Sequence, residues 1–278
     1  MGLSRRRFIQ LSLTSTALTA CYARWIEPHW IEMVPRRLPV KGLPADLVGR
    51  TLVQFSDLHI GPLVDDDYLR DAFHRVAKLR PDIVAMTGDF VSYRDAAQFG
   101  QMSGVLSAFP QGRLATVAIL GNHDYGHWWS EMAVADHVTS VATDAGITVL
   151  RNEALNVRGL QIVGLEDFWS PRFDPATTLA ASDPEAATVV LCHNPDAVDE
   201  DVWEGYEGWI LGGHTHGGQC KPPFLPPPVI PVRNKRYTAG AFALSGGRSL
   251  YINRGLGHLM RVRFNVRPEI TVFELARA

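Results

Sequence analysis

The stretch TLVQFSDLH, residues 51–59, joins five strand-forming residues to an abrupt polar ending. Its apolar run predicts a short buried strand, and Asp57 and His59 follow at the carboxyl end of that strand. A second apolar run, over residues 81–86, leads in the same way to Asp89. Strands that each end in a carboxylate favour a sheet whose polar residues gather at one edge.

Four further apolar runs repeat this pattern, and each stops at acidic, amide or imidazole side chains. The predicted strands span residues 114–120, 160–165, 188–191 and 209–211. Residues 65–80 start with acids, end with bases and carry apolar residues at helical spacing, which predicts an amphipathic helix stopped by Pro81. The fold class is therefore α/β, with sheets layered against helices.

Composition limits the classes of protein to consider. A chain of 278 residues with 46% apolar content can bury a large core, and we expect one large domain instead of two small ones. The net charge of −2 and a pI near 6.5 do not fit a broad basic surface, so no nucleic-acid partner is expected. Three scattered cysteines are too few for a disulfide framework.

The N-terminal residues 1–20, MGLSRRRFIQLSLTSTALTA, resemble a twin-arginine export signal. The apolar stretch after the arginines is too short to span a bilayer stably. Residues 18–21 look like a lipobox, in which Cys21 would be lipid-modified; an ordinary cleaved signal or a retained anchor are the alternatives. We therefore expect an exported protein at the periplasmic or extracytoplasmic face, associated with the membrane through its N-terminus.

Residues 21–49 form a segment rich in Trp, Pro and Arg between this signal and the first predicted strand. Trp and Arg beside an export signal suit a bilayer interface. An arm folded back on the domain is the equal alternative. The main domain is then expected over residues 50–278.

The polar residues at the strand ends form a set with the chemistry of metal ligands. Carboxylate, imidazole and amide groups suffice for two octahedral ions, with water completing the shells and no thiolate needed. The set is Asp57, His59, Asp89, Asn122, His193, His214 and His216. In residues 211–220, LGGHTHGGQC, two imidazoles one residue apart can each face a different ion, and the glycines let the backbone turn tightly.

Five blocks in this order resemble the calcineurin-like metallophosphoesterases. The blocks are Asp57-Leu58-His59, Gly88-Asp89, Gly121-Asn122-His123-Asp124, Cys192-His193 and Gly213-His214-Thr215-His216. The fuller forms SDLHIG and GHTHGGQ look like the exported or membrane-associated bacterial branch of that family. The resemblance covers about residues 50–275 and implies a layered β-sandwich flanked by helices, with a dinuclear metal site at the C-terminal ends of strands.

The resemblance also implies a role for each site residue. Asp57, His59 and His216 would hold the first ion. Asn122, His193 and His214 would hold the second, and Asp89 would bridge the two. His123 would donate a proton to the leaving oxygen or stabilise the phosphoryl charge, with Asp124 orienting it.

Three further positions are less specific. Cys192 stands where the family has glycine; a buried apolar cysteine is favoured over a thiol that binds a soft metal or oxidises. Arg254 and Gln219 are candidates for gripping a substrate phosphate, and structural roles are equally open for both. An apolar entrance to the site could be lined by Trp128, Trp129, Phe168, Trp169 and the loop 222–231, with core packing as the default role for each.

The function implied is metal-dependent hydrolysis of a phosphate ester or pyrophosphate bond, with water activated by two divalent ions, Mn²⁺ first and Fe/Zn as the alternative. A phosphorylated small molecule or lipid of the cell envelope is the expected substrate. A UDP-2,3-diacylglucosamine pyrophosphohydrolase of lipid A biosynthesis and a general phosphodiesterase on soluble substrates are the alternatives. A binding module without turnover is disfavoured, because the chain has the complete ligand set and also keeps His123 as a proton donor. Composition and motifs do not indicate an oligomeric state.

Overall fold

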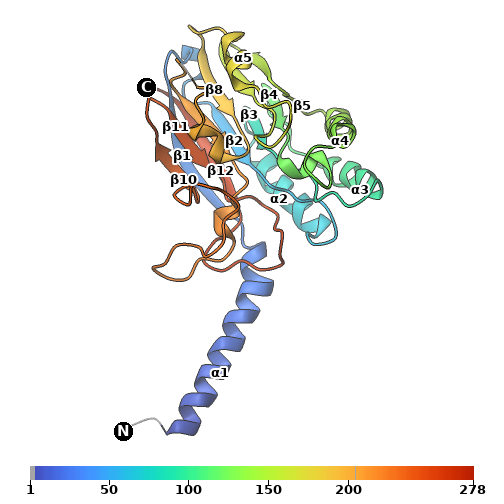
Figure 1. Ribbon diagram of the computed structural model, residues 1–278, viewed down its shortest axis with the longest axis vertical. Coiled ribbons are helices and arrows are strands. Elements are labelled where there is room, and N and C mark those ends of the chain that lie inside the picture. Colours follow the sequence, from blue (N-terminus) through green and yellow to red (C-terminus); the bar gives the residue numbers. More distant parts are fainter. Residues whose placement is uncertain (1–3, 204) are drawn as a thin grey trace.

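A computed structural model describes residues 4–203 and 205–278, and it consists of two six-stranded sheets packed face to face (Figure 1). Helices cover the outer face of one sheet, and helix α1 projects away from the sheets. This arrangement confirms the expected layered β-sandwich flanked by helices.

The first sheet has the order β1-β12-β2-β3-β4-β5. β2 through β5 run parallel, while β12 pairs antiparallel with β2 and parallel with β1. The strands are β1 (Glu32–Val40), β2 (Thr51–Phe55), β3 (Ile83–Thr87), β4 (Ala115–Ile119), β5 (Thr148–Val149) and β12 (Glu269–Arg277). The three strands predicted for this half of the chain are β2, β3 and β4.

The second sheet has the order β10-β11-β9-β8-β7-β6. Its four central strands are parallel, and an antiparallel strand pairs at each edge. The strands are β6 (Glu153–Val157), β7 (Leu160–Gly164), β8 (Ala187–Leu191), β9 (Trp209–Gly212), β10 (Gly240–Ala243) and β11 (Ser249–Ile252). The predicted strands of this half are β7, β8 and β9.

Among the described residues, four α-helices lie on the domain. They are α2 (Asp66–Lys78), α3 (Ala97–Leu106), α4 (Met132–Asp144) and the short α5 (Pro175–Ala180). α2 begins because the Asp65 side chain accepts a hydrogen bond from the Tyr68 amide, and its acidic first turn suits the helix dipole. This is the helix predicted over residues 65–80.

Alternate side chains along the central strands point to opposite faces of the sheet and so pack in two different hydrophobic cores. In β3, Ile83 and Ala85 face the second sheet, while Val84 and Met86 pack under the helices. Both faces of these strands are buried, which explains why they are continuous apolar runs. The other face of the second sheet packs against loops and short helical turns around Trp203.

The N-terminal region has two parts. Helix α1 (Arg5–Cys21) is exposed along its whole length, and residues 1–3 of the expected signal lie outside the described residues. Within 4–203 and 205–278, no helix is long and apolar enough to cross a membrane. From residue 22 the chain packs on the domain, and β1 becomes an edge strand. The first sheet therefore includes a strand from the segment 21–49, which the sequence places outside the domain starting at residue 50.

Candidate metal centre

The candidate site forms where strand ends of the two sheets meet. Asp57, Asp89 and Asn122 follow β2, β3 and β4, whereas His193 and His214 follow β8 and β9. The sheets are joined directly at this point, because the His214 amide lies 3.1 Å from both carboxylate oxygens of Asp57. Packing of the sheets, and not chain proximity, therefore assembles the site.

The first ligand group comprises Asp57, His59 and His216, all buried. Nε2 of His59 lies 3.0 Å from Nε2 of His216, which in turn lies 3.3 Å from Oδ1 of Asp57. Burial lowers the pKa of His59 to about 3, so the imidazole is a neutral lone-pair donor. Two such nitrogens about 3.0 Å apart have the spacing of neighbouring ligands on one ion with bonds of about 2.1 Å.

The second group comprises Asp89, His193 and His214. Asn122 follows β4, which pairs with β3, the strand that leads to Asp89. Nε2 of His193 lies 3.2 Å from Oδ2 of Asp89, and the rings of His193 and His214 are 5.1 Å apart. Oδ1 of Asn122 and Nε2 of His193 are buried without a hydrogen-bond partner among the described residues. Buried acceptors without partners are costly, so these atoms fit a cation.

Asp89 lies between the two groups. Its Oδ2 is 3.5 Å from Nε2 of His59 in the first group and 3.2 Å from Nε2 of His193 in the second. Its other oxygen accepts a hydrogen bond of 2.9 Å from the His123 amide, which fixes the carboxylate. One oxygen facing two ligand groups is the position that a bridging ligand needs.

Hydrogen bonds on the far side of each imidazole orient the ligands. Nδ1 of His193 donates to the Thr87 carbonyl at 2.7 Å, and Nε2 of His214 donates to the Pro231 carbonyl at 3.0 Å. These bonds leave Nε2 of His193 and Nδ1 of His214 with free lone pairs. Sequence reasoning missed these orienting carbonyls, because a backbone acceptor has no residue-type signature.

The backbone at the site is unusual. Five candidate ligands have φ in the left-handed region, between 50° and 70°: Asp57, His59, Asp89, His214 and His216. This conformation is uncommon outside glycine and clusters at functional sites. The turns bring side chains from successive strand ends back to one point.

His123 and Asp124 lie beside the ligands, and a ring nitrogen of His123 comes within 4.8 Å of ligand atoms of His59 and Asp89, which makes these three a further group that could hold an ion. The ring of His123 packs edge-on to that of His59, with centroids 5.0 Å apart. Asp124 accepts hydrogen bonds from the amides of Gly121 and Val91, at 2.9 Å and 3.1 Å. Its carboxylate therefore holds the backbone around the ligands, and the described contacts do not bring it to the His123 ring as expected.

Two tryptophans lie beside His123 and the ligand His214. Trp129 and Trp169 stack with ring centroids 4.6 Å apart. Trp129 is edge-on to His123 at 6.3 Å, and Trp169 is edge-on to His214 at 4.9 Å. The structure thus brings together the aromatic residues from two distant loops at the candidate site.

The two candidate phosphate-binding residues, Arg254 and Gln219, make contacts with other parts of the protein. The Arg254 guanidinium pairs with Glu269 and, at 2.9 Å, with Glu32. The Gln219 amide donates to the carbonyls of Met260 and Val262, each at 3.0 Å. These contacts support the structural alternatives for both residues over direct binding of phosphate.

Cys192 is buried among apolar residues, as the favoured reading of this position expects. Its Sγ lies 3.7 Å from the Asn194 carbonyl, and burial raises the pKa of the thiol. A buried thiol of raised pKa is a poor metal ligand and a slow target for oxidation. The cysteine therefore acts as a small core residue.

Two packed sheets with paired Asp/His groups at their strand ends define a hydrolase with a dinuclear metal site. The chain belongs to the calcineurin-like phosphoesterase family, whose model matches residues 50–218. It is therefore a phosphohydrolase, and the dinuclear site of that family has its candidate ligands in the two groups described above.

Curated relatives match over nearly the whole chain. The chain is 33% identical to phosphodiesterase YaeI of Escherichia coli K12, covering 98% of this chain and 99% of the relative. It is 32% identical to the uncharacterized metallophosphoesterase YkuE of Bacillus subtilis 168, with 98% of each chain covered. It is 27% identical to the UDP-2,3-diacylglucosamine pyrophosphatase LpxG of Chlamydia muridarum, with 94% of each covered.

Proposed function

We propose that this phosphohydrolase cleaves a phosphate ester or pyrophosphate bond of a lipid or cell-envelope substrate, with two Mn²⁺ ions as the native metals. The observation that carries the two-metal part is the position of Asp89 Oδ2, 3.5 Å from His59 Nε2 and 3.2 Å from His193 Nε2. Mn²⁺ is favoured because the ligands are carboxylate, imidazole and amide without thiolate, and a mixed Fe/Zn pair is the alternative.

In this proposal the residues divide into holders of metal and a proton donor. Asp57, His59 and His216 hold one ion, Asn122, His193 and His214 hold the other, and Asp89 bridges. When bound, the two ions supply an activated water and neutralise charge on the phosphoryl group. His123 makes no hydrogen bond to a ligand side chain through its ring among the described residues, so it is free to protonate the leaving oxygen.

Replacement of the bridge tests the two-metal assignment. Asp89→Ala should lose both ions and turnover, because each ion depends on the same carboxylate. Elemental analysis of the folded, purified variant measures the metal content, and the exposed Asp67→Ala is the matched control. Two tightly held ions in folded Asp89→Ala would show that the ligand assignment is wrong.

The proposed substrate class is supported by the relatives: one is named a phosphodiesterase and another a UDP-2,3-diacylglucosamine pyrophosphatase. Lipid A pyrophosphohydrolysis is the second candidate, and an export signal argues against it because nucleotide sugars are cytoplasmic. Metal-loaded protein should be assayed against soluble mono- and diesters, extracted envelope lipids and UDP-2,3-diacylglucosamine. Preference for soluble diesters over every lipid would contradict the lipid assignment.

We also propose that residues 1–20 direct export by the twin-arginine route and that the N-terminus associates with the membrane, with Cys21 lipidation or a retained helix as the means. Support comes from Arg5 and Arg6 ahead of an apolar stretch and from the exposure of Cys21 at the end of α1. Folding before export would allow the metals to be acquired in the cytoplasm.

A further inference from the structure

Two loops carry exposed apolar side chains at the end of the molecule from which α1 leaves (Figure 1). The proline-rich loop, residues 222–231, exposes Phe224 completely and Val229 to 74%. The loop after β11 exposes Met260 to 60%, next to Leu259. We call Phe224, Leu225, Val229, Leu259 and Met260 the loop-tip surface.

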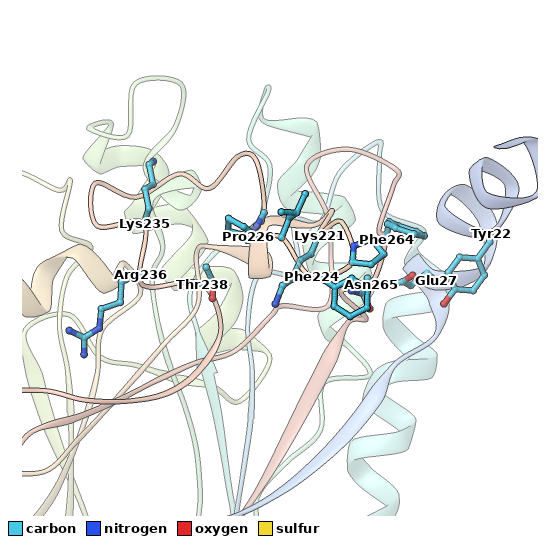
Figure 2. Close-up of a pocket in the computed structure, with 13 residues that line it drawn as sticks. Tyr22, Glu27, Lys221, Phe224, Pro226, Lys235, Arg236, Thr238, Phe264 and Asn265 are labelled. Atoms are coloured by element: carbon cyan, nitrogen blue, oxygen red, sulfur yellow. The ribbon is translucent and has the colours of Figure 1, made fainter. Parts of the chain in front are cut away.

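The loop-tip surface is continuous with the base of α1. The Arg263 amide donates to the Ala23 carbonyl, and the Lys221 amide donates to the Phe264 carbonyl. Between these segments lies a cavity of about 860 Å³, whose lining includes Tyr22, Phe224 and Phe264 (Figure 2). Segments far apart in the sequence thus form one surface around the point where α1 ends.

The charge around this surface is positive. Lys221, Lys235, Arg236 and Arg261 are all exposed. Arg236 and Arg261 donate hydrogen bonds to backbone carbonyls. These bonds do not neutralise the positive charge of either guanidinium. The acid in the cavity lining is Glu27, which is buried and accepts a hydrogen bond from the Val266 amide.

We propose that the loop-tip surface docks the catalytic domain on a bilayer containing anionic phospholipid, in addition to any attachment through the N-terminus. Large apolar side chains exposed together mark an interaction site, and a rim of Lys and Arg is attracted to anionic headgroups. Exposed Trp25 and Trp30 at the base of α1 belong to the same end, and Arg267 lies 3.6 Å over the Trp30 ring. Amphipathic aromatic and cationic groups of this kind suit the headgroup layer.

Docking would act directly beside the metal centre. Gln219 holds the second loop through the Met260 and Val262 carbonyls, and it lies three residues after His216. In the proline-rich loop, the Pro231 carbonyl accepts the hydrogen bond of the His214 ring. The proline-rich loop therefore also orients one candidate ligand, His214.

Hydrogen exchange of the full chain with vesicles tests the proposal. Peptides covering residues 219–236 and 256–266 should exchange several-fold more slowly with phosphatidylcholine vesicles that contain phosphatidylglycerol than with phosphatidylcholine alone. This readout is local, so binding through α1 cannot imitate it. Unchanged exchange in both peptides on vesicle-bound protein would overturn the proposal.

Variants provide the second measurement. Phe224→Asp with Met260→Asp should weaken co-sedimentation with the mixed vesicles at least tenfold, about 1.4 kcal/mol. The control is Val48→Asp, an exposed apolar residue that precedes β2 and so lies at the opposite end of that strand from Asp57. Equal binding of both variants would contradict the proposal.

Hydrolysis of soluble p-nitrophenyl esters should stay unchanged in the loop-tip variant, so loss of docking can be separated from failure of the proposed substrate class. If the two peptides become protected without vesicles as the protein concentration rises, the surface binds a second copy of the chain and the bilayer assignment is wrong.

Discussion

Backbone hydrogen bonds hold the individual ligand residues in unusual conformations. Asp57 and His59 adopt left-handed backbone conformations, and their amides donate to the Gly88 and Asp89 carbonyls at 2.9 Å and 3.1 Å. Each such conformation costs about 1–2 kcal/mol for a non-glycine residue. Hydrogen bonds between neighbouring strand ends offset that cost and keep the side chains close together.

His123 is the residue whose replacement separates catalysis from metal binding. His123→Asn should keep metal content and fold while lowering turnover by roughly 10²–10⁴-fold, the usual contribution of a general acid. Turnover of metal-loaded variant and wild type, with elemental analysis of both, measures this.

The loss in His123→Asn should shrink for esters with stable leaving anions such as p-nitrophenolate, because such oxygens need less proton donation. A series of leaving groups of rising pKa provides the measurement. Equal losses across the series would show that His123 stabilises the phosphoryl group instead of protonating the departing oxygen.

At the scale of elements, the candidate ligands follow the ends of strands, and a glycine allows the strand ends of the two sheets to approach each other closely. A Cβ on Gly213 would overlap Ser56 Oγ and the Asp57 carboxylate, both from the first sheet. Gly213 is thus the point where the second sheet touches the ligand-bearing end of β2.

Gly213→Ala should therefore destabilise the fold by about 1–3 kcal/mol and reduce the content of the ion held by Asp57. Gly100→Ala is the matched control, because Gly100 lies inside α3 with open space around its Cβ position. That control should stabilise by about 0.5–1 kcal/mol. Denaturant unfolding measures both, and a neutral Gly213→Ala would mean that the sheets can separate at this contact.

The loop after β11 is tied to the loop after β2 by His258, whose Nε2 donates to the Leu63 carbonyl at 3.0 Å. Burial lowers the pKa of His258 from its ordinary 6.5 to about 4. The unfolded chain therefore binds the proton more readily. The stability contributed by neutral His258 is complete above pH 6.5 and is lost as the pH falls toward 4.

The difference in unfolding free energy between wild type and His258→Gln should consequently shrink by about 3 kcal/mol between pH 7 and pH 4. Denaturant unfolding at a series of pH values measures it. The exposed His74→Gln on α2 is the control. A difference between wild type and His258→Gln that stays constant with pH would contradict the assignment.

At the scale of the whole molecule, the N-terminal segment divides into a projecting part and a part that belongs to the domain. Helix α1 projects from the domain, whereas the chain from Tyr22 onward packs on it and β1 joins the first sheet (Figure 1). Removal of residues 1–20 would therefore leave the sheets complete, while cleavage after residue 40 would remove β1.

Arg5→Lys combined with Arg6→Lys should leave the folded protein in the cytoplasm, because the twin-arginine pair is the proposed recognition element of the export signal. Cell fractionation measures the location, and Arg24→Lys, beyond the proposed signal, is the control. Unchanged export of the double variant with Arg7 also replaced would contradict this route.

Sequence alone determined six of the strands and the residue types of the candidate site. β2, β3, β4, β7, β8 and β9 are apolar because both faces are buried, so their runs and polar endings are visible along the chain. The strands β1, β5, β6, β10, β11 and β12 were not predicted. Of these, the edge strands β1 and β10 are half-exposed and contain prolines or glycines, so they lack such a run.

Only the tertiary structure decided which atoms meet. It placed Asp89 Oδ2 between His59 and His193, turned the Asp124 carboxylate toward backbone amides, and engaged Arg254 with Glu32 and Glu269. These outcomes depend on how two separately formed sheets pack, which sequence spacing does not encode. Residue type is a local property of the chain, whereas the partner of each polar atom is a property of the packed whole.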